Sequence, residues 1–207
     1  MFDDPYYSLA GGLDETRHVF LEGNALTRRM DQPLHVAELG FGTGLNLLAL
    51  WELWLSGPKA PMRFTSFEAY PMAKPDMAAA LAAFPQVAEL ASAFLAAWSP
   101  EQPNVDLAPD FTLNVVIGDA RQTLPAWDGQ ADAWFLDGFS PAKNPELWDP
   151  ALIAAVGQKT APNGTAATYS AAGHVRQSLA AAGFDVTRVP GFGRKRHMTT
   201  ARLHDAK

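Results

Sequence analysis

The fold is decided by the stretch His35-Val36-Ala37-Glu38-Leu39-Gly40-Phe41-Gly42-Thr43-Gly44-Leu45-Asn46. A short apolar strand runs into a turn that has glycine at every second position, and an apolar helical run over residues 45–55 follows at once. Glycine lets the backbone approach a ligand closely and adopt positive φ. A strand, a glycine-rich turn and a helix N-terminus together form a nucleotide-binding arrangement in α/β proteins.

The spacing of the glycines narrows the choice of ligand. The dinucleotide pattern G-x-G-x-x-G would need its third glycine at position 45, which is Leu45, whereas the third glycine here is Gly44. The spacing G-x-G-x-G is more similar to the S-adenosylmethionine loop of a Rossmann-like methyltransferase, and it disfavours a nicotinamide-dependent dehydrogenase. A turn that merely needs glycine remains the alternative.

Composition points to one α/β domain. The chain has 207 residues, 48% of them hydrophobic and 18% charged, which is enough to bury a large core. No run approaches the ~20 apolar residues that span a bilayer, and the acidic N-terminus does not resemble a signal peptide. The chain has no cysteine, and its five histidines are scattered. We therefore expect a cytoplasmic protein without a metal site or membrane segment.

Charge is distributed unevenly along the chain. The net charge is −6, which argues against broad nucleic-acid binding. Residues 1–156 hold eight Lys or Arg against twenty Asp or Glu, whereas residues 157–207 hold eight against two. A basic C-terminal segment on an acidic body is typical of a phosphate-facing surface, or of an ordinary solvated face.

Three further predicted strands each end close to an acidic residue. Residues 64–67 lead to Glu68, Phe111–Ile117 to Asp119, and Ala131–Leu136 to Asp137. Glu68 lies near the distance from the glycines at which an acid meets a ribose, and Asp119 either accepts from an amine such as that of adenine or caps the next turn. Because ligands bind at the carboxyl ends of parallel strands, these acids predict a site at one sheet edge.

The remaining pattern sets the topology. We expect two helices over residues 75–98 broken at Pro85, a connecting loop over 99–110, helices over 147–159 and 173–182, and strands over 165–169, 184–189 and His197–Leu203. The link over residues 190–196 is too short for a parallel crossover, so the last two strands must pair antiparallel. Residues 1–30 are expected to pack on the domain as irregular structure, with Asp14 capping a short helix.

Several segments together resemble the methyltransferase domain of the bacterial tRNA 5-methylaminomethyl-2-thiouridine biosynthesis protein, the MnmC-like family. The most specific of them is Asp137-Gly138-Phe139-Ser140-Pro141-Ala142-Lys143-Asn144-Pro145. The others are residues 2–8, 12–17, 19–24, 40–46, 67–68, 118–120 and 191–198. The resemblance covers nearly the whole chain.

The resemblance implies a class I methyltransferase fold, α/β and Rossmann-like, with a mostly parallel seven-stranded sheet and an antiparallel C-terminal strand. It implies a single domain over residues 1–207, with residues 1–30 packing over the site, and it implies that the oxidase domain fused in the family is absent. A separate flavin-dependent oxidase would then act upstream. The donor would be S-adenosyl-L-methionine, and the acceptor the aminomethyl group of 5-aminomethyl(-2-thio)uridine at the tRNA wobble position.

The resemblance also assigns roles to residues. The glycine loop would hold the methionine portion of the donor, Glu68 the ribose, and Asp119 with Ala120 the adenine, while Asp137 would be catalytic beside the methyl group and the amine. The cofactor-binding set is Gly40, Phe41, Gly42, Thr43, Gly44, Asn46, Glu68, Asp119, Ala120 and Asp137.

A second set of residues is expected to bind the substrate. Aromatic faces would be offered by Tyr6, Tyr7 and Phe139, and contacts to tRNA by Lys143, Asn144, Arg194, Lys195 and Arg196. Two other functions stay open from the residues alone. One is an N-methyltransferase for a small amine, and the other is a non-catalytic module that binds S-adenosylmethionine.

Overall fold

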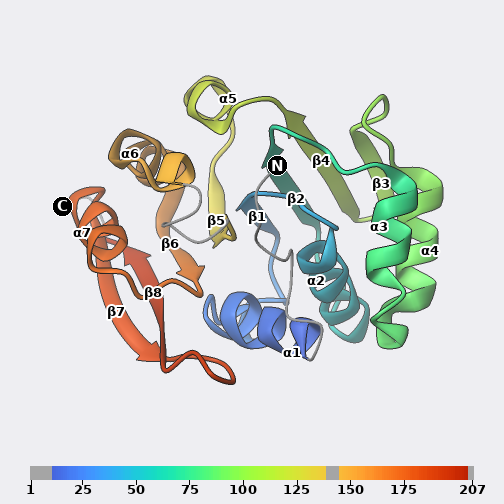
Figure 1. Ribbon diagram of the computed structural model, residues 1–207, viewed down its shortest axis with the longest axis horizontal. Coiled ribbons are helices and arrows are strands. Elements are labelled where there is room, and N and C mark those ends of the chain that lie inside the picture. The colour runs from blue at the N-terminus through green and yellow to red at the C-terminus, as the bar shows by residue number, and fades with distance from the viewer. Residues whose placement is uncertain (1–10, 139–144, 205–207) are drawn as a thin grey trace.

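The computed structural model describes residues 11–138 and 145–204, and its centre is an eight-stranded sheet (Figure 1). The strand order is β3-β4-β2-β1-β5-β6-β8-β7. The strands are β1 Leu34–Leu39, β2 Met62–Glu68, β3 Asn104–Ala108, β4 Phe111–Ile117, β5 Ala131–Leu136, β6 Thr160–Thr168, β7 Phe184–Pro190 and β8 His197–Leu203.

The middle of the sheet is parallel, as predicted. Strand β1 pairs in parallel with β2 and β5, β2 pairs in parallel with β4, and β5 with β6. All six residues of β1 are buried, because a central parallel strand is covered on both faces. The predicted α/β class with a mostly parallel sheet is confirmed.

The prediction of seven strands was wrong by one. Residues 99–110, expected to be a connecting loop, contain strand β3, which pairs antiparallel with β4 at the edge of the sheet. The other edge is as expected, because β7 and β8 form an antiparallel hairpin. Strand β8 also pairs antiparallel with β6. Among β5, β6, β7 and β8, it is therefore the strand that runs antiparallel to β1.

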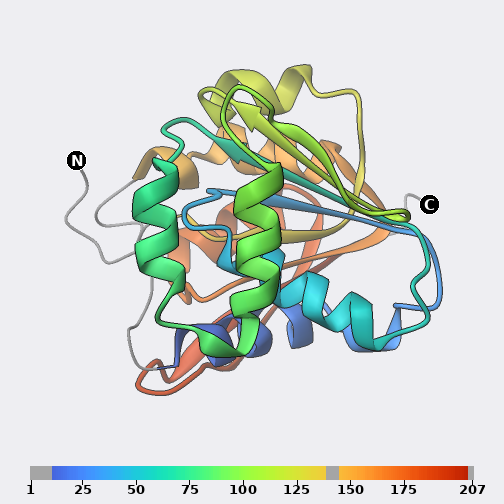
Figure 2. The same cartoon turned by 90° about the vertical axis from the view of Figure 1, so that its right-hand side faces the viewer.

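Helices cover both faces of the sheet, with α1 and α2 on one side and α5 and α6 on the other (Figure 1). The break predicted at Pro85 is confirmed, and α3 and α4 lie side by side (Figure 2). The helices are α1 Gly12–Thr16, α2 Leu45–Ser56, α3 Lys74–Leu81, α4 Ala88–Ala97, α5 Ala120–Ala126, α6 Pro150–Gln158 and α7 Gly173–Ala181. Short helical turns are η1 Arg17–Glu22, η2 Leu26–Arg28, η3 Pro85–Val87 and η4 Pro145–Trp148.

The first described residues pack on the domain as predicted, but they form helical turns over residues 12–22 and 26–28 where irregular structure was expected. Asp14 does not cap the first helix, because α1 begins after Gly11 and Asp14 lies in its first turn, 2.9 Å from Arg17 Nη1. Arg17 also bonds Glu52 of α2 at 2.6 Å. These contacts fix α1 to the helix that follows the glycine loop.

The expected absence of a membrane segment and the expected absence of a metal site both stay predictions. In the part of the chain that the structure describes, no single helix has the length and apolar character needed to cross a membrane, and only the bent pair of α3 with residues 85–97 passes that test jointly. Among the same residues, no three His, Asp or Glu side chains are grouped as metal ligands.

Candidate active site

Four strand ends meet at one edge of the sheet, as the sequence predicted. The register pairs Leu39 of β1 with Phe67 of β2 and with Leu136 of β5, and it pairs Glu68 with Ile117 of β4. The residues that directly follow these positions are therefore neighbours in space. They include the glycine loop, Glu68, Asp119 and Asp137, which is the set expected to form the site.

The glycine loop has a backbone that requires glycine. Gly40, Gly42 and Gly44 have φ values of +88°, +51° and +80°. A Cβ on Gly40 would lie 3.0 Å from the carbonyl oxygen of Asp137, so the loop passes close to the end of β5. Helix α2 begins directly after Gly44, with its N-terminus at this edge. The loop thus leaves backbone and helix N-terminus where a ligand can approach closely.

The side chain of Phe41 belongs to the core. It is 4% exposed, and its ring centroid lies 5.8 Å from that of Phe94 and 5.3 Å from that of Trp98. Thr43 is also buried. Phe41 therefore anchors the loop on α4 and can offer a ligand only its backbone.

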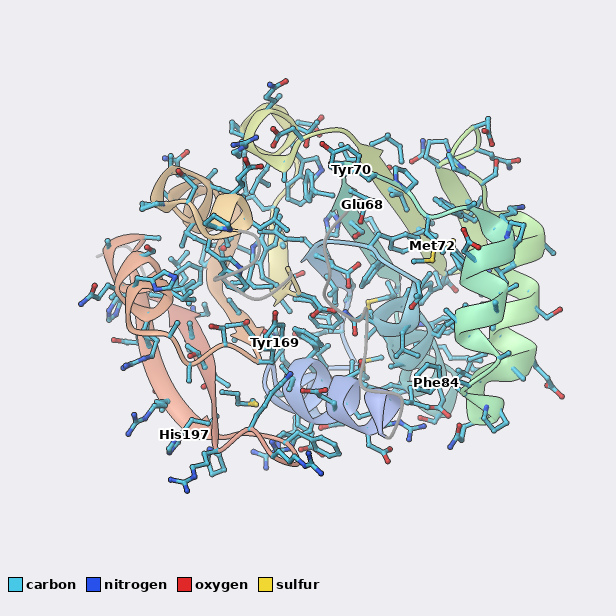
Figure 3. All side chains as sticks on the ribbon, in the orientation of Figure 1. Glu68, Tyr70, Met72, Phe84, Tyr169 and His197 are labelled. Atoms are coloured by element: carbon cyan, nitrogen blue, oxygen red, sulfur yellow. The ribbon has the colours of Figure 1, made fainter. Side chains whose placement is uncertain are left out.

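Glu68 closes the loop from the side of β2. Its Oε2 accepts from the backbone N–H groups of Phe41 and Gly42 at 2.9 and 3.3 Å, and its Oε1 accepts from the N–H of Tyr70 at 2.8 Å. Tyr70 is 79% exposed, and Figure 3 places it beside Glu68 at the end of β2. A carboxylate has about four lone-pair positions, so capacity for ribose hydroxyls remains, and that role stays a prediction.

Asp119 is a helix cap in this structure. Its Oδ1 accepts from the N–H of Arg121 at 2.9 Å, and the guanidinium of Arg121 bonds both carboxylate oxygens at 2.6 to 3.0 Å. The side-chain and backbone hydrogen bonds from Arg121 hold the pKa of Asp119 below its usual range. Capping was one of the two roles open from the sequence. Contact with adenine, for Asp119 and the buried Ala120, stays a prediction.

Asn46, one of the expected cofactor-binding residues, is buried at the centre of a polar network. Its side chain is 6% exposed. Its Nδ2 donates to Glu38 Oε1 at 2.8 Å and to Asp137 Oδ2 at 2.6 Å, while its Oδ1 accepts from Thr16 Oγ1 at 2.9 Å. Asn46 thus joins α1, β1 and the end of β5 through one amide, because an amide both donates and accepts.

The two carboxyl groups bound to Asn46 both have a raised pKa. Burial raises the pKa of the fully buried Glu38 well above its usual value, and hydrogen bonds from Ser66 and Asn46 oppose this. Burial also raises the pKa of Asp137 from 3.8 to about 6, against the hydrogen bond from Asn46. A carboxyl with a pKa near 6 can exchange protons at neutral pH, which suits acid–base chemistry.

Glu38 was missed as a site residue. It lies in the quoted stretch, two positions before Gly40, and it is the acidic residue of an otherwise largely apolar strand. A carboxylate in a strand buried on both faces needs partners, since burying an unpaired charge is costly. An acidic residue in an otherwise largely apolar strand was therefore the sequence signal that could have identified Glu38.

The expected substrate-binding residues fall into two groups. Tyr6, Tyr7, Phe139, Lys143 and Asn144 lie outside the described residues. The basic residues of the link between β7 and β8 are described, and the structure separates them.

Arg194 and Arg196 have exposed side chains on that link, as a phosphate contact requires. Lys195 is different, because its Nζ lies 2.6 Å from Glu15 Oε1 and 4.1 Å above the ring centroid of Tyr169. In this structure Lys195 therefore bonds to side chains of the protein, and its predicted contact with tRNA phosphates stays a prediction.

The comparisons with known proteins agree with this geometry. Residues 85–204 match the family model of S-adenosyl-L-methionine-dependent methyltransferases. The chain is 47% identical over 205 residues to the tRNA 5-methylaminomethyl-2-thiouridine biosynthesis bifunctional protein MnmC of Pseudomonas savastanoi pv. phaseolicola, covering 94% of this chain and 31% of that protein. It is 44% identical to the protein of the same name from Caulobacter vibrioides, covering 97% and 35%.

Solved structures show the same fold. The structure of MNMC2 from Aquifex aeolicus matches with a TM-score of 0.78 and 29% identity, covering 98% of this chain and 65% of that one. The amino pentose methyltransferase CalS10 from Micromonospora echinaspora, solved with its methyl donor, has a TM-score of 0.51 at 13% identity. The chain spans about a third of the length of the curated relatives quoted above.

The cofactor that these comparisons show, S-adenosyl-L-methionine, fits the residues present. Gly40, Gly42 and Gly44 take positive φ and carry no side chain, so a ligand can approach the loop closely at the start of α2. Glu68 and Asp119 follow on the neighbouring strands, where a ribose and a base would lie. The chain belongs to the S-adenosyl-L-methionine-dependent methyltransferases.

Proposed function

We propose that this chain transfers a methyl group from S-adenosyl-L-methionine to the primary amine of 5-aminomethyl(-2-thio)uridine at the wobble position of tRNA. The names of the relatives support the substrate, since they describe biosynthesis of tRNA 5-methylaminomethyl-2-thiouridine. The observation that carries the proposal is Asp137, which ends β5 beside the glycine loop and shares the amide of Asn46 with Glu38.

When bound, S-adenosyl-L-methionine supplies a methyl group that its sulfonium already activates. The protein then has to position the amine in line, form the N–C bond as the C–S bond breaks, and let the amine lose its proton. An alkylamine is largely protonated at pH 7, because its pKa is near that of lysine, ~10.4. Asp137 accepts a hydrogen bond from the amine, orients its lone pair and relays the proton to water.

The fixed geometry of Asp137 explains why it suits this role. Its Oδ2 is held by Asn46, which leaves Oδ1 for the acceptor, and its carbonyl oxygen lies close to Gly40 of the donor loop. A carboxylate also stabilises an ammonium, so we assign Asp137 to orientation first and to proton relay second. Glu38 holds Asn46 from the other side, and it positions Asp137 without touching the substrate.

The donor and tRNA contacts are part of the proposal. The loop over residues 40–44 holds the methionine portion, Glu68 the ribose, and Asp119 with Ala120 the adenine. Arg194 and Arg196 meet phosphates of the tRNA, because their exposed side chains lie on the basic part of the chain. A separate flavin-dependent oxidase acting upstream stays a prediction, since the relatives are named bifunctional.

The substitution Asp137→Ala tests the assignment. Calorimetry should show donor affinity close to that of the wild type, because the glycine loop and Glu68 are unchanged, while methyl transfer to hypomodified tRNA should be lost. Asp128→Ala is the matched control, since Asp128 is an exposed acid before β5, at the opposite end of that strand. Full transfer activity in the Asp137 variant would overturn the proposal.

A further inference from the structure

The ammonium group of Lys195 occupies a defined site formed by Glu15 and Tyr169, and the hydroxyl of Tyr169 bonds the residue that follows Asp137. Its Nζ lies 2.6 Å from Glu15 Oε1 and 4.1 Å from the ring centroid of Tyr169. The side chain of Glu15 is only 18% exposed, whereas that of Lys195 is 47% exposed. A carboxylate and an aromatic face around one alkylammonium are the elements that bind such cations.

Both parts of this site are tied to Asp137 by other hydrogen bonds. The hydroxyl of Tyr169 donates to the carbonyl oxygen of Gly138, the residue after Asp137, at 2.6 Å. Glu15 precedes Thr16, whose hydroxyl bonds Asn46, and Asn46 bonds Asp137. Figure 3 shows Tyr169 beside the α1 segment that carries Glu15. The ring of Tyr169 and the α1 turn that carries Glu15 are therefore held near Asp137 by bonds other than those of Lys195.

The link between β7 and β8 also has other contacts that hold it in place. Gly191 N–H donates to the carbonyl oxygen of Arg196 at 3.1 Å, which closes the turn. The His18 ring lies 5.9 Å from that of Phe192, and its Nε2 lies 3.3 Å from the carbonyl oxygen of Pro190. Release of the Lys195 ammonium would leave these contacts intact.

We propose that Glu15 and Tyr169 form an alkylammonium subsite beside Asp137, which Lys195 fills in the absence of substrate and which the acceptor's aminomethyl group takes over. This inference rests on the proposed function, because it assumes a primary amine as acceptor. The side chain of lysine ends in the same chemical group, a primary ammonium on a methylene. One alkylammonium replaces another, so the displacement requires little net free energy.

The subsite explains selection of the acceptor. A uridine without the aminomethyl group has no cation to exchange for that of Lys195, so it would leave Lys195 in place. The amine is recognised as an ammonium by Glu15 and Tyr169, and it then lies next to Asp137, where it loses its proton. Glu15 and Tyr169 thus determine specificity, while Asp137 serves the transfer itself.

The test compares affinities for two anticodon stem-loops, one carrying 5-aminomethyluridine and one carrying unmodified uridine, with S-adenosylhomocysteine present to prevent turnover. In the Lys195→Met background, where no lysine competes, Glu15→Gln should weaken binding of the amine-bearing RNA about fivefold and leave the unmodified RNA unchanged. Lys195→Met should do the opposite and tighten binding of the amine-bearing RNA about threefold, because the competing ammonium is gone. Lys195→Arg keeps the cation and should gain less.

Arg194→Met is the matched control, since it removes an exposed cation from the same link and should affect both RNAs alike. Equal weakening of both RNAs by Lys195→Met would make Lys195 a phosphate contact and overturn the subsite. Equal weakening of both by Glu15→Gln would also overturn it. A wild-type enzyme that methylates neither RNA would instead refute the proposed function, so the two failures are distinguishable.

Discussion

Asp137→Asn is expected to stabilise the fold while it removes methyl transfer. Burial raises the pKa of Asp137 from 3.8 to about 6, so the folded protein binds this proton more tightly than the unfolded chain does. Stability therefore falls as the pH rises from about 4 to about 6, and the full cost is present above that range. Asparagine has no proton to lose and can still accept the hydrogen bond from Asn46.

The size of the effect follows from the shift in pKa. A shift of about two units corresponds to about 3 kcal/mol at ~1.4 kcal/mol per unit, and the partial exposure of Asp137 makes this an upper limit. We expect Asp137→Asn to gain about 2 kcal/mol in free energy of unfolding at pH 7.5. For a chain of this size that is a rise in Tm of roughly 4 to 8 °C.

Urea unfolding of the wild type and Asp137→Asn at pH 7.5 and at pH 4 measures this gain. The difference should be present at pH 7.5 and nearly vanish at pH 4, where the wild-type carboxyl is protonated in the folded state. Asp128→Asn, at an exposed position, should show no difference at either pH. A less stable Asp137→Asn at pH 7.5, or a gain that persists unchanged at pH 4, would refute the reasoning.

Three further outcomes are expected. Gly40→Ala should lower the free energy of unfolding by about 1–2 kcal/mol, because φ is +88° there and the new Cβ would lie 3.0 Å from a carbonyl oxygen. Calorimetry should also show weaker binding of the donor to this variant. Asn46→Ala should move the acidic limb of the pH–kcat profile upward, because it removes the hydrogen bond that lowers the pKa of Asp137; an unmoved limb would contradict this. Replacing Arg194 and Arg196 by alanine should reduce the slope of log affinity for tRNA against log salt concentration by roughly 1.5. Arg63→Ala, at the end of β2 away from Glu68, should leave that slope unchanged. An unchanged slope in the Arg194 and Arg196 variant would favour a small-amine substrate.

The sheet edge that forms the site was predictable because its signals are local. A parallel strand buried on both faces appears as a largely apolar run, and an acidic residue at or just after its end is conspicuous, as at Glu68 and Asp137. The register then brings those ends together without further information. The hairpin of β7 and β8 was predictable for a related reason, since seven linking residues allow only antiparallel pairing.

The features that sequence reasoning missed depend on tertiary contacts. Strand β3 lies at the sheet edge between Pro103 and Pro109 and buries little, so its sequence resembles a loop. The role of Asn46 depends on Glu38 and Asp137, which approach it from other strands. Lys195 bonds Glu15, a residue 180 positions away, which no local pattern indicates.

The most direct test of the account follows the methyl group itself. Wild-type protein is incubated with S-adenosyl-L-methionine labelled in its methyl group and with tRNA from cells that lack this modification, and the tRNA is then digested to nucleosides. The label is expected in 5-methylaminomethyl(-2-thio)uridine from the wobble position. Label in a different nucleoside, or no label in tRNA while the donor binds, would contradict it.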